Sequence, residues 1–258
     1  MSNSALQTGS LVVDIGNTQS VFGIFDGDSV SHVRRVASHE RSRSRVRDEL
    51  KELSLLSGFT NAIIGSVVPS LNTTWQELLQ EHYAITPLLV SPELELGISI
   101  DYPNPENIGA DRLANACAAC KRFGSPVVVA DFGTALTFDI IGEGNVYLGG
   151  VIAPGLPMMT DYLADKTALL PRIDLYDTAS SIGKSTEDAM CIGANIGYRG
   201  IARELLGEIE SELNAAPLTV VATGGYSEQV LRGLDLNIQY WPDLTLCGLG
   251  YILSANPA

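Results

Sequence analysis

Two segments of the sequence place an acid, a glycine and an amide or hydroxyl directly after a short apolar run. The first is DIGNTQSVFGIFDGD at residues 14–28, and the second is DFGTALTFDIIGEG at residues 131–144. In each, the polar turn is followed by a second apolar run and an acidic glycine turn, which is typical of paired strands. Either turn alone is consistent with an ordinary hairpin. The alternative is that a highly charged ligand binds to it.

The residue types in these turns suit the binding of phosphate. Glycine has no Cβ, so backbone N–H groups can approach phosphate oxygens closely. Asn17, Thr18 and Thr134 would add neutral hydrogen-bond donors. Because phosphates are already negative, an aspartate beside them must serve a cation. Asp14 is suited to hydrated Mg²⁺, and Asp131 to a second cation.

A third glycine turn, ATGGYS at 222–227, also follows an apolar run. Three such turns at strand ends suit a nucleotide in a cleft between two domains. The shared plan of the first two turns, in which Asp14 aligns with Asp131, indicates an internal repeat of two related α/β halves. We therefore predict an N-terminal domain over residues 1–124 and a C-terminal domain over residues 125–258.

The segment GADR at 109–112 begins a predicted helix and has two interpretations. Asp111 could cap the helix beside a surface arginine. Alternatively, Asp111 is a base for a substrate hydroxyl, and Arg112 holds an anionic group. An ordinary aspartate is a weak base, but this suffices for phosphoryl transfer because the transition state is loose and positioning supplies most of the acceleration.

Apolar periodicity predicts the elements that carry these turns. Strands are expected over 11–36, 61–67 and from 127 onward. Helices are expected over 41–59, over 70–83, from near Gly109, and over 244–253. In the first helix the apolar face consists of Val46, Leu50 and Leu53, and in the second of Leu71, Trp75, Leu78 and Leu79.

The segment GGVIAPGLPMM at 149–159 is predicted to be a glycine-rich loop that enters a helix, and a long helix is expected over 184–213. The apolar positions of the long helix are Met190, Ala194, Gly197, Ile201, Leu205 and Ile209. Its interior glycines lower helix stability by about 1 kcal/mol each relative to alanine. Close approach of another helix, such as one from a neighbouring subunit, would explain them.

The composition narrows the class of protein. The chain has 258 residues and a net charge of −14, which disfavours binding to nucleic acid or an anionic membrane. The arginine-rich segment 41–47 is therefore interpreted as a solvated helix start. Cys117 and Cys120 form C-x-x-C within a predicted helix, where buried thiols are favoured over redox or metal chemistry. Residues 1–10 lack the features of a signal peptide, so we predict a cytoplasmic protein.

Taken together, the motifs resemble those of the type III pantothenate kinases. The segments that carry the resemblance are DIGNTQSVFGIFDGD, YPNPENIGADR, DFGTALTFD, GGVIAPGL, ADKTALLPRI, GKSTEDAM and ATGGYS. They follow the family's order and spacing and span nearly the whole chain from Leu11 onward. One departure is Leu136, which stands where the family usually has threonine and puts the polar contacts of the second motif in question.

The resemblance implies a fold and an activity. The fold is α/β, with two ribonuclease-H-like domains of the actin, sugar-kinase and heat-shock-chaperone ATPase superfamily and a nucleotide in the interdomain cleft. The activity is transfer of the γ-phosphoryl group of ATP to pantothenate, giving 4'-phosphopantothenate in the first step of coenzyme A synthesis. The family is homodimeric, so pantothenate, ATP and a second copy of the chain are the expected partners.

The resemblance also implies roles for individual residues. The ATP-binding set is Asp14, Ile15, Gly16, Asn17, Thr18, Gln19, Ser20, Val21 and Thr134, with Asp14 near Mg²⁺, through water. The pantothenate-binding set is Tyr102, Gly109, Ala110, Asp111, Arg112 and Thr186, with Asp111 as proton acceptor. Asp131 is implied to bind a monovalent cation, K⁺ or NH₄⁺. Thr186 is expected to reach the substrate from the partner chain.

Two other classes of function compete with this one. A non-catalytic nucleotide-binding regulator would lack the acids of the cleft, yet Asp14, Asp111 and Asp131 are all present. A different small-molecule kinase or an actin-like ATPase could share the fold. Actin-like proteins are longer, with insertions for which this chain has no room. An assay of ADP release with several small alcohols would distinguish one small-molecule kinase from another.

Overall fold

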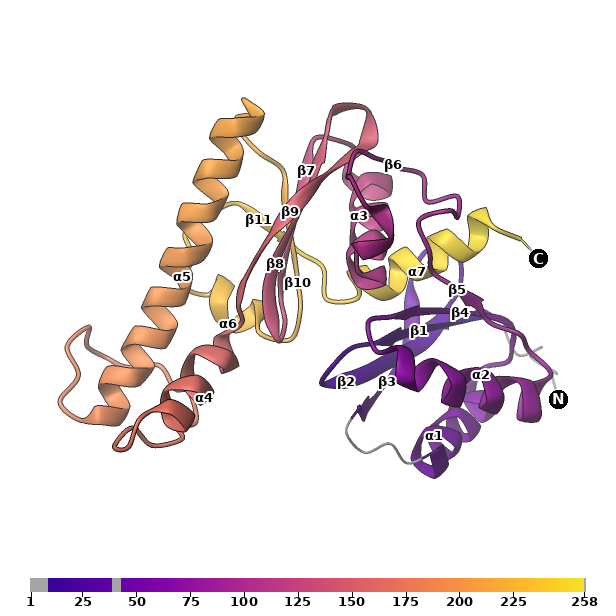
Figure 1. Ribbon diagram of the computed structural model, residues 1–258, viewed down its shortest axis with the longest axis horizontal. Helices are drawn as coiled ribbons and strands as arrows, with labels where there is room; N and C mark the ends of the chain where they lie inside the picture. Colours follow the sequence, from indigo (N-terminus) through magenta and orange to yellow (C-terminus); the bar gives the residue numbers. More distant parts are fainter. Residues whose placement is uncertain (1–8, 39–42, 258) are drawn as a thin grey trace, which may run out of the picture. The chain divides into compact units, whose positions relative to one another are not determined.

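The computed structural model describes residues 9–38 and 43–257, which form two compact units (Figure 1). The first unit contains the described residues up to Gly124, together with Asn145–Leu148 and the segment that begins at Asp243. The second contains Ser125–Gly144 and Gly149–Pro242. The end of the chain therefore packs in the first unit, whereas the sequence prediction assigned it to the second domain. The predicted leader and part of the arginine-rich segment lie outside the described residues.

The first unit is built on a five-stranded sheet of order β3-β2-β1-β4-β5. Its strands are β1 (Gly9–Ile15), β2 (Gln19–Phe25), β3 (Val30–Ala37), β4 (Phe59–Ser66) and β5 (Leu88–Leu89). The first three are joined by short turns and run antiparallel, whereas β4 is parallel to β1 and β5 is parallel to β4. Parallel neighbours need a crossover, and α2 supplies the one between β4 and β5.

The second sheet repeats this plan. Its strands are β7 (Val127–Phe132), β8 (Ala135–Gly142), β9 (Val146–Pro154), β10 (Val220–Thr223) and β11 (Ile238–Tyr240), with β6 (Ser99–Ile100) added at the edge. The order β11-β10-β7-β8-β9-β6 matches the first sheet when β6 is set aside. β7 is antiparallel to β8 and parallel to β10, as β1 is to β2 and β4. This topology confirms the internal repeat.

One element was predicted wrongly. The glycine-rich segment 149–154 is part of strand β9, not a loop. Its residues take the place of the third strand of the repeat, and pairing within the sheet overrides the low strand preference of glycine. The helix expected after this segment is present as α4 (Leu156–Lys166).

Helices cover both faces of the first sheet (Figure 1). They are α1 (Arg43–Leu56), α2 (Pro69–Tyr83), α3 (Ala110–Phe123) and α7 (Leu244–Ala255), with a short 3-10 turn at Pro105–Asn107. The predicted apolar faces of α1 and α2 are buried against Leu11, Val13 and Ile15. On the other face, the side chain of Leu249 and the Cβ of Ala110 lie over Gly65 of β4. This second face carries Asp14, because alternate residues of a strand point to opposite sides.

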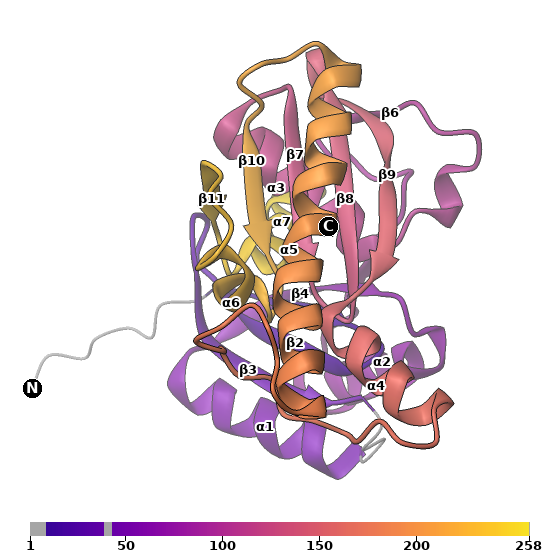
Figure 2. The same cartoon turned by 90° about the vertical axis from the view of Figure 1, so that its left-hand side faces the viewer.

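In the second unit the long helix α5 (Thr186–Leu213) runs across the sheet (Figure 2). Ser185 caps it, because its Oγ accepts a hydrogen bond from the N–H of Asp188 at 3.0 Å. The sequence prediction placed Gly197, Ile201 and Leu205 on the buried face. Instead, the buried positions in that stretch are Tyr198, Ala202 and Leu206. The buried stripe is displaced by one residue because Tyr198 packs its ring against Phe132, whereas Gly197 has no side chain to bury. The remaining helix, α6 (Ser227–Leu231), follows β10.

The structure confirms that the arginine-rich helix start is solvated and that the thiols of the C-x-x-C segment are buried. Arg43 forms ion pairs of 2.6 Å with both Glu77 and Glu81, so the described start of α1 is a solvated, paired surface. Cys117 and Cys120 are buried, and burial raises the pKa of their thiols to about 12 and about 11. These thiols are therefore un-ionised and unreactive near neutral pH. Within residues 9–38 and 43–257, no helix is both long and apolar enough to span a membrane.

Candidate functional site

Asp14 and Asp131 occupy equivalent positions in the two sheets. Asp14 is the penultimate residue of β1, beside Val21 of β2 and Gly65 of β4. Asp131 is the penultimate residue of β7, beside Thr137 of β8 and Thr223 of β10. The equivalence predicted from the sequence is thus confirmed. Each acid lies where an antiparallel and a parallel neighbour flank the end of the central strand.

The first polar turn is held from one side by Ser38, the residue after β3. The backbone N–H of Ser38 donates to the carbonyl of Thr18 at 2.9 Å, and its Oγ donates to the carbonyl of Gly16 at 2.6 Å. Across a planar trans peptide, the N–H points opposite to the carbonyl. The N–H of Asn17 therefore faces away from Ser38, toward the side from which an anion could approach.

We expect Ser38→Ala to weaken ATP binding without changing the chemical step. The variant loses the Oγ hydrogen bond but keeps the backbone one, so the turn loosens only partly. One neutral hydrogen bond contributes about 1 kcal/mol, so the KM for ATP should rise about fivefold while kcat changes little. Steady-state kinetics with varied ATP would measure this. Ser29→Ala is the control, because Ser29, among the residues that the structure describes, hydrogen-bonds within the neighbouring Asp26 turn. An unchanged KM in Ser38→Ala would show that the turn does not contact ATP.

The second polar turn is closed on the same side by a glycine. Gly155 follows β9, as Ser38 follows β3, and a Cβ on it would overlap the carbonyl oxygens of Gly133 and Thr134. The backbones therefore approach closely, and those two carbonyls face Gly155. As in the first turn, the next N–H groups face the opposite way. Both repeats thus use the residue after the third strand to fix the orientation of the turn.

Leu136 has a structural explanation. It is fully buried in the core of the second unit, in a cluster that also includes Phe132 and Tyr198. Thr134 is exposed, and Thr137 lies on the other face of β8, beside Asp131. A threonine at position 136 would place its hydroxyl in the core, so Leu136 removes nothing from the polar side of the turn.

The carboxylate of Asp131 lies between two glycine turns. A Cβ on Gly133 would lie 3.2 Å from its Oδ1, and one on Gly224 would overlap the same oxygen and the backbone of Phe132. Gly224 also has φ +97°, a conformation that other residues rarely adopt. The carbonyl of Phe132 accepts from the N–H of Tyr226 at 3.0 Å, just as that of Ile15 accepts from Val67 in the first unit.

Tyr198 of α5 also lies in the environment of Asp131, although the sequence did not point to it. The residue is fully buried, and its ring packs edge-on against Phe132 with centroids 6.1 Å apart. Burial raises the pKa of its hydroxyl, and the negative charge of Asp131 raises it further. Tyr198 therefore stays neutral beside the acid.

The GADR segment is not a simple helix cap. Gly109 is the capping residue of α3, and Asp111 is the second residue of the helix. The Oδ1 of Asp111 accepts the N–H of Arg112 at 2.8 Å, and a Cβ on Gly109 would lie only 2.5 Å from that oxygen. Burial raises the pKa of Asp111 above the ordinary 3.8, although the N–H and charge of Arg112 oppose the rise. A partly buried carboxylate with a raised pKa is a better general base.

The first polar turn and the GADR helix adjoin the same loop of the first unit. Val67 donates its N–H to the carbonyl of Ile15, and its Cγ1 lies 3.3 Å from where a Cβ of Gly109 would be. The loop after β4 therefore touches both segments. The structure thus brings the first polar turn, assigned to ATP, and the GADR segment, assigned to the substrate, together within one unit.

The other two predicted substrate residues belong to separate segments of the chain. Tyr102 follows β6 in the first unit and is 38% exposed. Thr186 is exposed at the first turn of α5, in the second unit. Its contact with the substrate of the partner chain remains a prediction.

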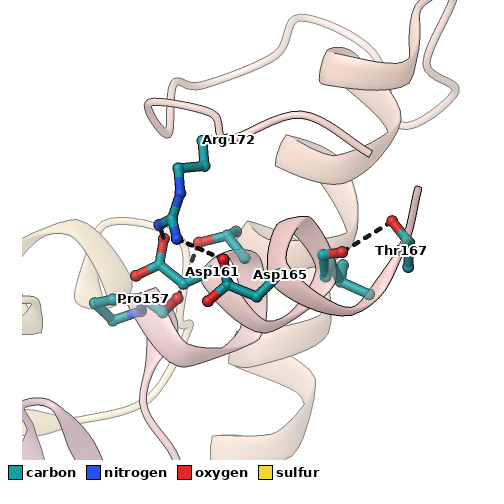
Figure 3. Close-up of polar contacts among 7 residues, drawn as sticks. Pro157, Asp161, Asp165, Thr167 and Arg172 are labelled. Carbon is teal, nitrogen blue, oxygen red and sulfur yellow. Dashed lines mark hydrogen bonds and ion pairs between the residues drawn. The ribbon is translucent and has the colours of Figure 1, made fainter. Parts of the chain in front are cut away.

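The segment that leads to Thr186 is fixed to the helices on both sides of it. The guanidinium of Arg172 lies 3.2 Å from Asp161 and also pairs with Asp165, both on α4 (Figure 3). Farther along, the hydroxyl of Tyr176 donates to Asp188 of α5 at 2.6 Å. Arg172, within the motif ADKTALLPRI, therefore helps to hold the segment that precedes α5 in place.

Comparison with known proteins settles the family. The model of the family described as type III pantothenate kinase matches residues 10–208. The chain belongs to the type III pantothenate kinase family. A type III pantothenate kinase from Akkermansia muciniphila is 43% identical, covering 95% of this chain and 98% of that protein. One from Dehalococcoides mccartyi is 37% identical and covers 99% of both chains.

A solved structure agrees on the fold. A Sinorhizobium meliloti protein assigned as a 2-dehydro-3-deoxygalactonokinase has a TM-score of 0.64 at 15% identity, covering 96% of this chain and 97% of that one. With the two repeated sheets, this likeness confirms the predicted α/β fold of two related halves, which the two proteins share. The family match, over residues 10–208, includes Asp14, Asp111 and Asp131.

Proposed function

We propose that this chain phosphorylates pantothenate with ATP and that Asp111 accepts the proton of the substrate hydroxyl. Membership of the type III pantothenate kinase family carries the reaction. The geometry of Asp111, a partly buried carboxylate at the start of a helix that adjoins the same loop as the first polar turn, supports its role.

The reaction is a single phosphoryl transfer. The hydroxyl oxygen of pantothenate forms a bond to the γ-phosphorus, and the bond from that phosphorus to the bridging oxygen of ADP breaks. The hydroxyl proton passes to a carboxylate oxygen of Asp111. Because the transition state is loose, the proton leaves late, and a carboxylate of moderate basicity suffices. Arg112, whose guanidinium is always charged, would bind the carboxylate of pantothenate.

The experiment that tests this function is a coupled ADP-release assay with pantothenate and a panel of other small alcohols. Turnover with pantothenate that exceeds the others by orders of magnitude is expected. Release of ADP with a different alcohol would identify another small-molecule kinase. Nucleotide binding without turnover on any alcohol would support the non-catalytic regulator.

We assign the two cation sites to single carboxylates. Among the described residues, no three His, Cys, Asp or Glu side chains are grouped to hold a metal ion. Asp14 would therefore hold Mg²⁺ through water, with phosphate oxygens as further ligands. Asp131 would hold the monovalent cation, since the neighbouring residues Gly133 and Gly224 place no side chain against its Oδ1. When bound, these cations would offset the negative charge of the phosphates.

Exchange of the monovalent cation tests the assignment of Asp131. Replacing K⁺ or NH₄⁺ by Li⁺, at constant ionic strength, should slow turnover severalfold, because a small, strongly hydrated ion gives up its water reluctantly for a single carboxylate. The measurement is kcat in each chloride salt. Equal rates in K⁺, Na⁺ and Li⁺ would remove Asp131 as a cation ligand.

We also propose that the chain is a homodimer joined through α5. Gly193, Gly197 and Gly200 have open space where a Cβ would project, and Ile196 beside them is 44% exposed. Such small residues allow another helix to approach closely. Thr186 at the start of the same helix would then reach the substrate of the partner chain.

Sedimentation equilibrium should give twice the 27.5 kDa mass of one chain. Gly197→Leu should shift the mass toward that of the monomer and reduce turnover, because a large side chain would separate the helices. A fully active monomer would contradict a shared substrate pocket.

A further inference from the structure

Tyr147 lies between two of the side chains assigned to pantothenate, although nothing in the sequence drew attention to it. It is the second residue of β9 and is fully buried. The guanidinium carbon of Arg112 lies 5.9 Å from the centroid of its ring. The ring of Tyr102 packs edge-on against it, with centroids 6.4 Å apart and planes at 68°. One ring therefore contacts residues from two separate segments of the chain.

The backbone of Tyr147 holds the second of these segments as well. β6 pairs in parallel with the start of β9, with Ser99 beside Val146 and Ile100 beside Tyr147. The carbonyl of Tyr147 then accepts the N–H of Asp101 at 2.9 Å. Tyr102 is the next residue, so its backbone position depends on Tyr147 through this pairing and its ring position through the aromatic contact. These residues all belong to the first unit.

The ring restricts side chains that would otherwise be mobile. Arginine has several rotatable bonds, and holding its guanidinium in one place on binding lowers affinity. A guanidinium within about 6 Å of an aromatic centroid is attracted to the face of the ring. Edge-on packing likewise favours one orientation of Tyr102. A fixed ring thus prepares both side chains before the substrate arrives.

We propose that Tyr147 is a positioning residue for pantothenate, which it serves by holding Arg112 and Tyr102 in their binding orientations. The proposal rests on the proposed function, in which those two residues contact the substrate. Tyr147 acts on the affinity for pantothenate, through the ring and not through the hydroxyl. It has no part in ATP binding or in the proton transfer to Asp111.

The chain offers a matched control in Tyr251 of α7. That tyrosine is also nearly buried in the first unit, has a cation over its ring (Lys121 Nζ at 4.0 Å) and packs edge-on against another ring (Phe25 at 5.4 Å). It therefore loses the same kinds of contact when truncated. Neither Lys121 nor Phe25 is among the residues assigned to a substrate.

The test compares Tyr147→Leu, Tyr147→Phe and Tyr251→Leu by steady-state kinetics and by calorimetric titration with pantothenate. In Tyr147→Leu, the KM and Kd for pantothenate should rise about tenfold, as expected for loss of a desolvated cation–ring contact. The KM for ATP and kcat should stay within about twofold. Tyr147→Phe should restore the affinity, and Tyr251→Leu should leave it unchanged.

Any of three results would overturn this proposal and leave the proposed function intact. These are an unchanged KM for pantothenate in Tyr147→Leu, an equal rise in the KM for ATP, or a Tyr147→Phe variant as weak as the leucine. If Tyr147→Leu does not fold, Tyr147→Met, which keeps most of the volume but no ring, takes its place under the same criteria. In an Arg112→Ala background the leucine change should add less than about threefold to the Kd. Failure of the wild-type chain to phosphorylate pantothenate would instead refute the proposed function.

Discussion

Replacing Asp111 by asparagine is expected to lower kcat by about 10²-fold or more, the usual contribution of a general base. Asparagine has nearly the same shape and can still accept the N–H of Arg112, but it cannot take the proton of the hydroxyl. The KM for ATP should change little, since Asp111 is assigned to the other substrate. Glu106→Gln, which removes an exposed acid from the turn just before α3, is the control. Near-normal turnover of Asp111→Asn would remove its role as base.

The same carboxylate determines the expected pH dependence. Burial raises the pKa of Asp111 above the ordinary 3.8 in the free enzyme. The base must be ionised to accept a proton, so kcat/KM should fall as the pH is lowered through that raised pKa. This acid limb should therefore lie at a higher pH than an ordinary aspartate would give, and Asp111→Asn should lack it. Persistence of the limb in that variant would assign it to another group.

Gly155→Ala is expected to displace the backbone of the second polar turn. The φ of Gly155 is −71°, which alanine adopts freely, so the effect is purely steric. The new methyl group would overlap backbone atoms of Gly133 and Thr134, which cannot move aside as a flexible side chain would. We expect a loss of about 1–3 kcal/mol in the free energy of unfolding, as in overpacked sites. The KM for ATP should rise at least tenfold.

Gly207→Ala provides the matched control for this prediction. Gly207 lies in α5, and a Cβ added there would have no atom within 4 Å beyond its own helix, so the same chemical change meets no obstacle. In a helix interior it should raise stability by up to about 1 kcal/mol. Thermal unfolding and ATP titration of both variants separate the two effects. If Gly155→Ala binds ATP as tightly as Gly207→Ala does, the approach of Gly155 does not orient the turn.

Local patterns in the sequence were enough for the repeat and most of its elements. The apolar faces of α1 and α2 followed from helical spacing, and the equivalence of Asp14 and Asp131 followed from two matching segments. Such features are encoded over a few residues, because strand alternation and helical periodicity reflect which side of one element is buried. The burial of Leu136 could have been found in the same way, from alternation along β8.

The sequence by itself therefore determined that this chain repeats one α/β plan, carries three glycine turns at strand ends and belongs with a known family of kinases. Only the tertiary structure showed that Ser38 and Gly155 orient two of those turns, that α7 packs beside α3, and that Tyr147 joins Arg112 to Tyr102. Each of these depends on segments far apart in the chain. Short-range patterns indicate that a residue is buried, but not which distant segment packs against it. That segment is determined by how the whole sheet is assembled.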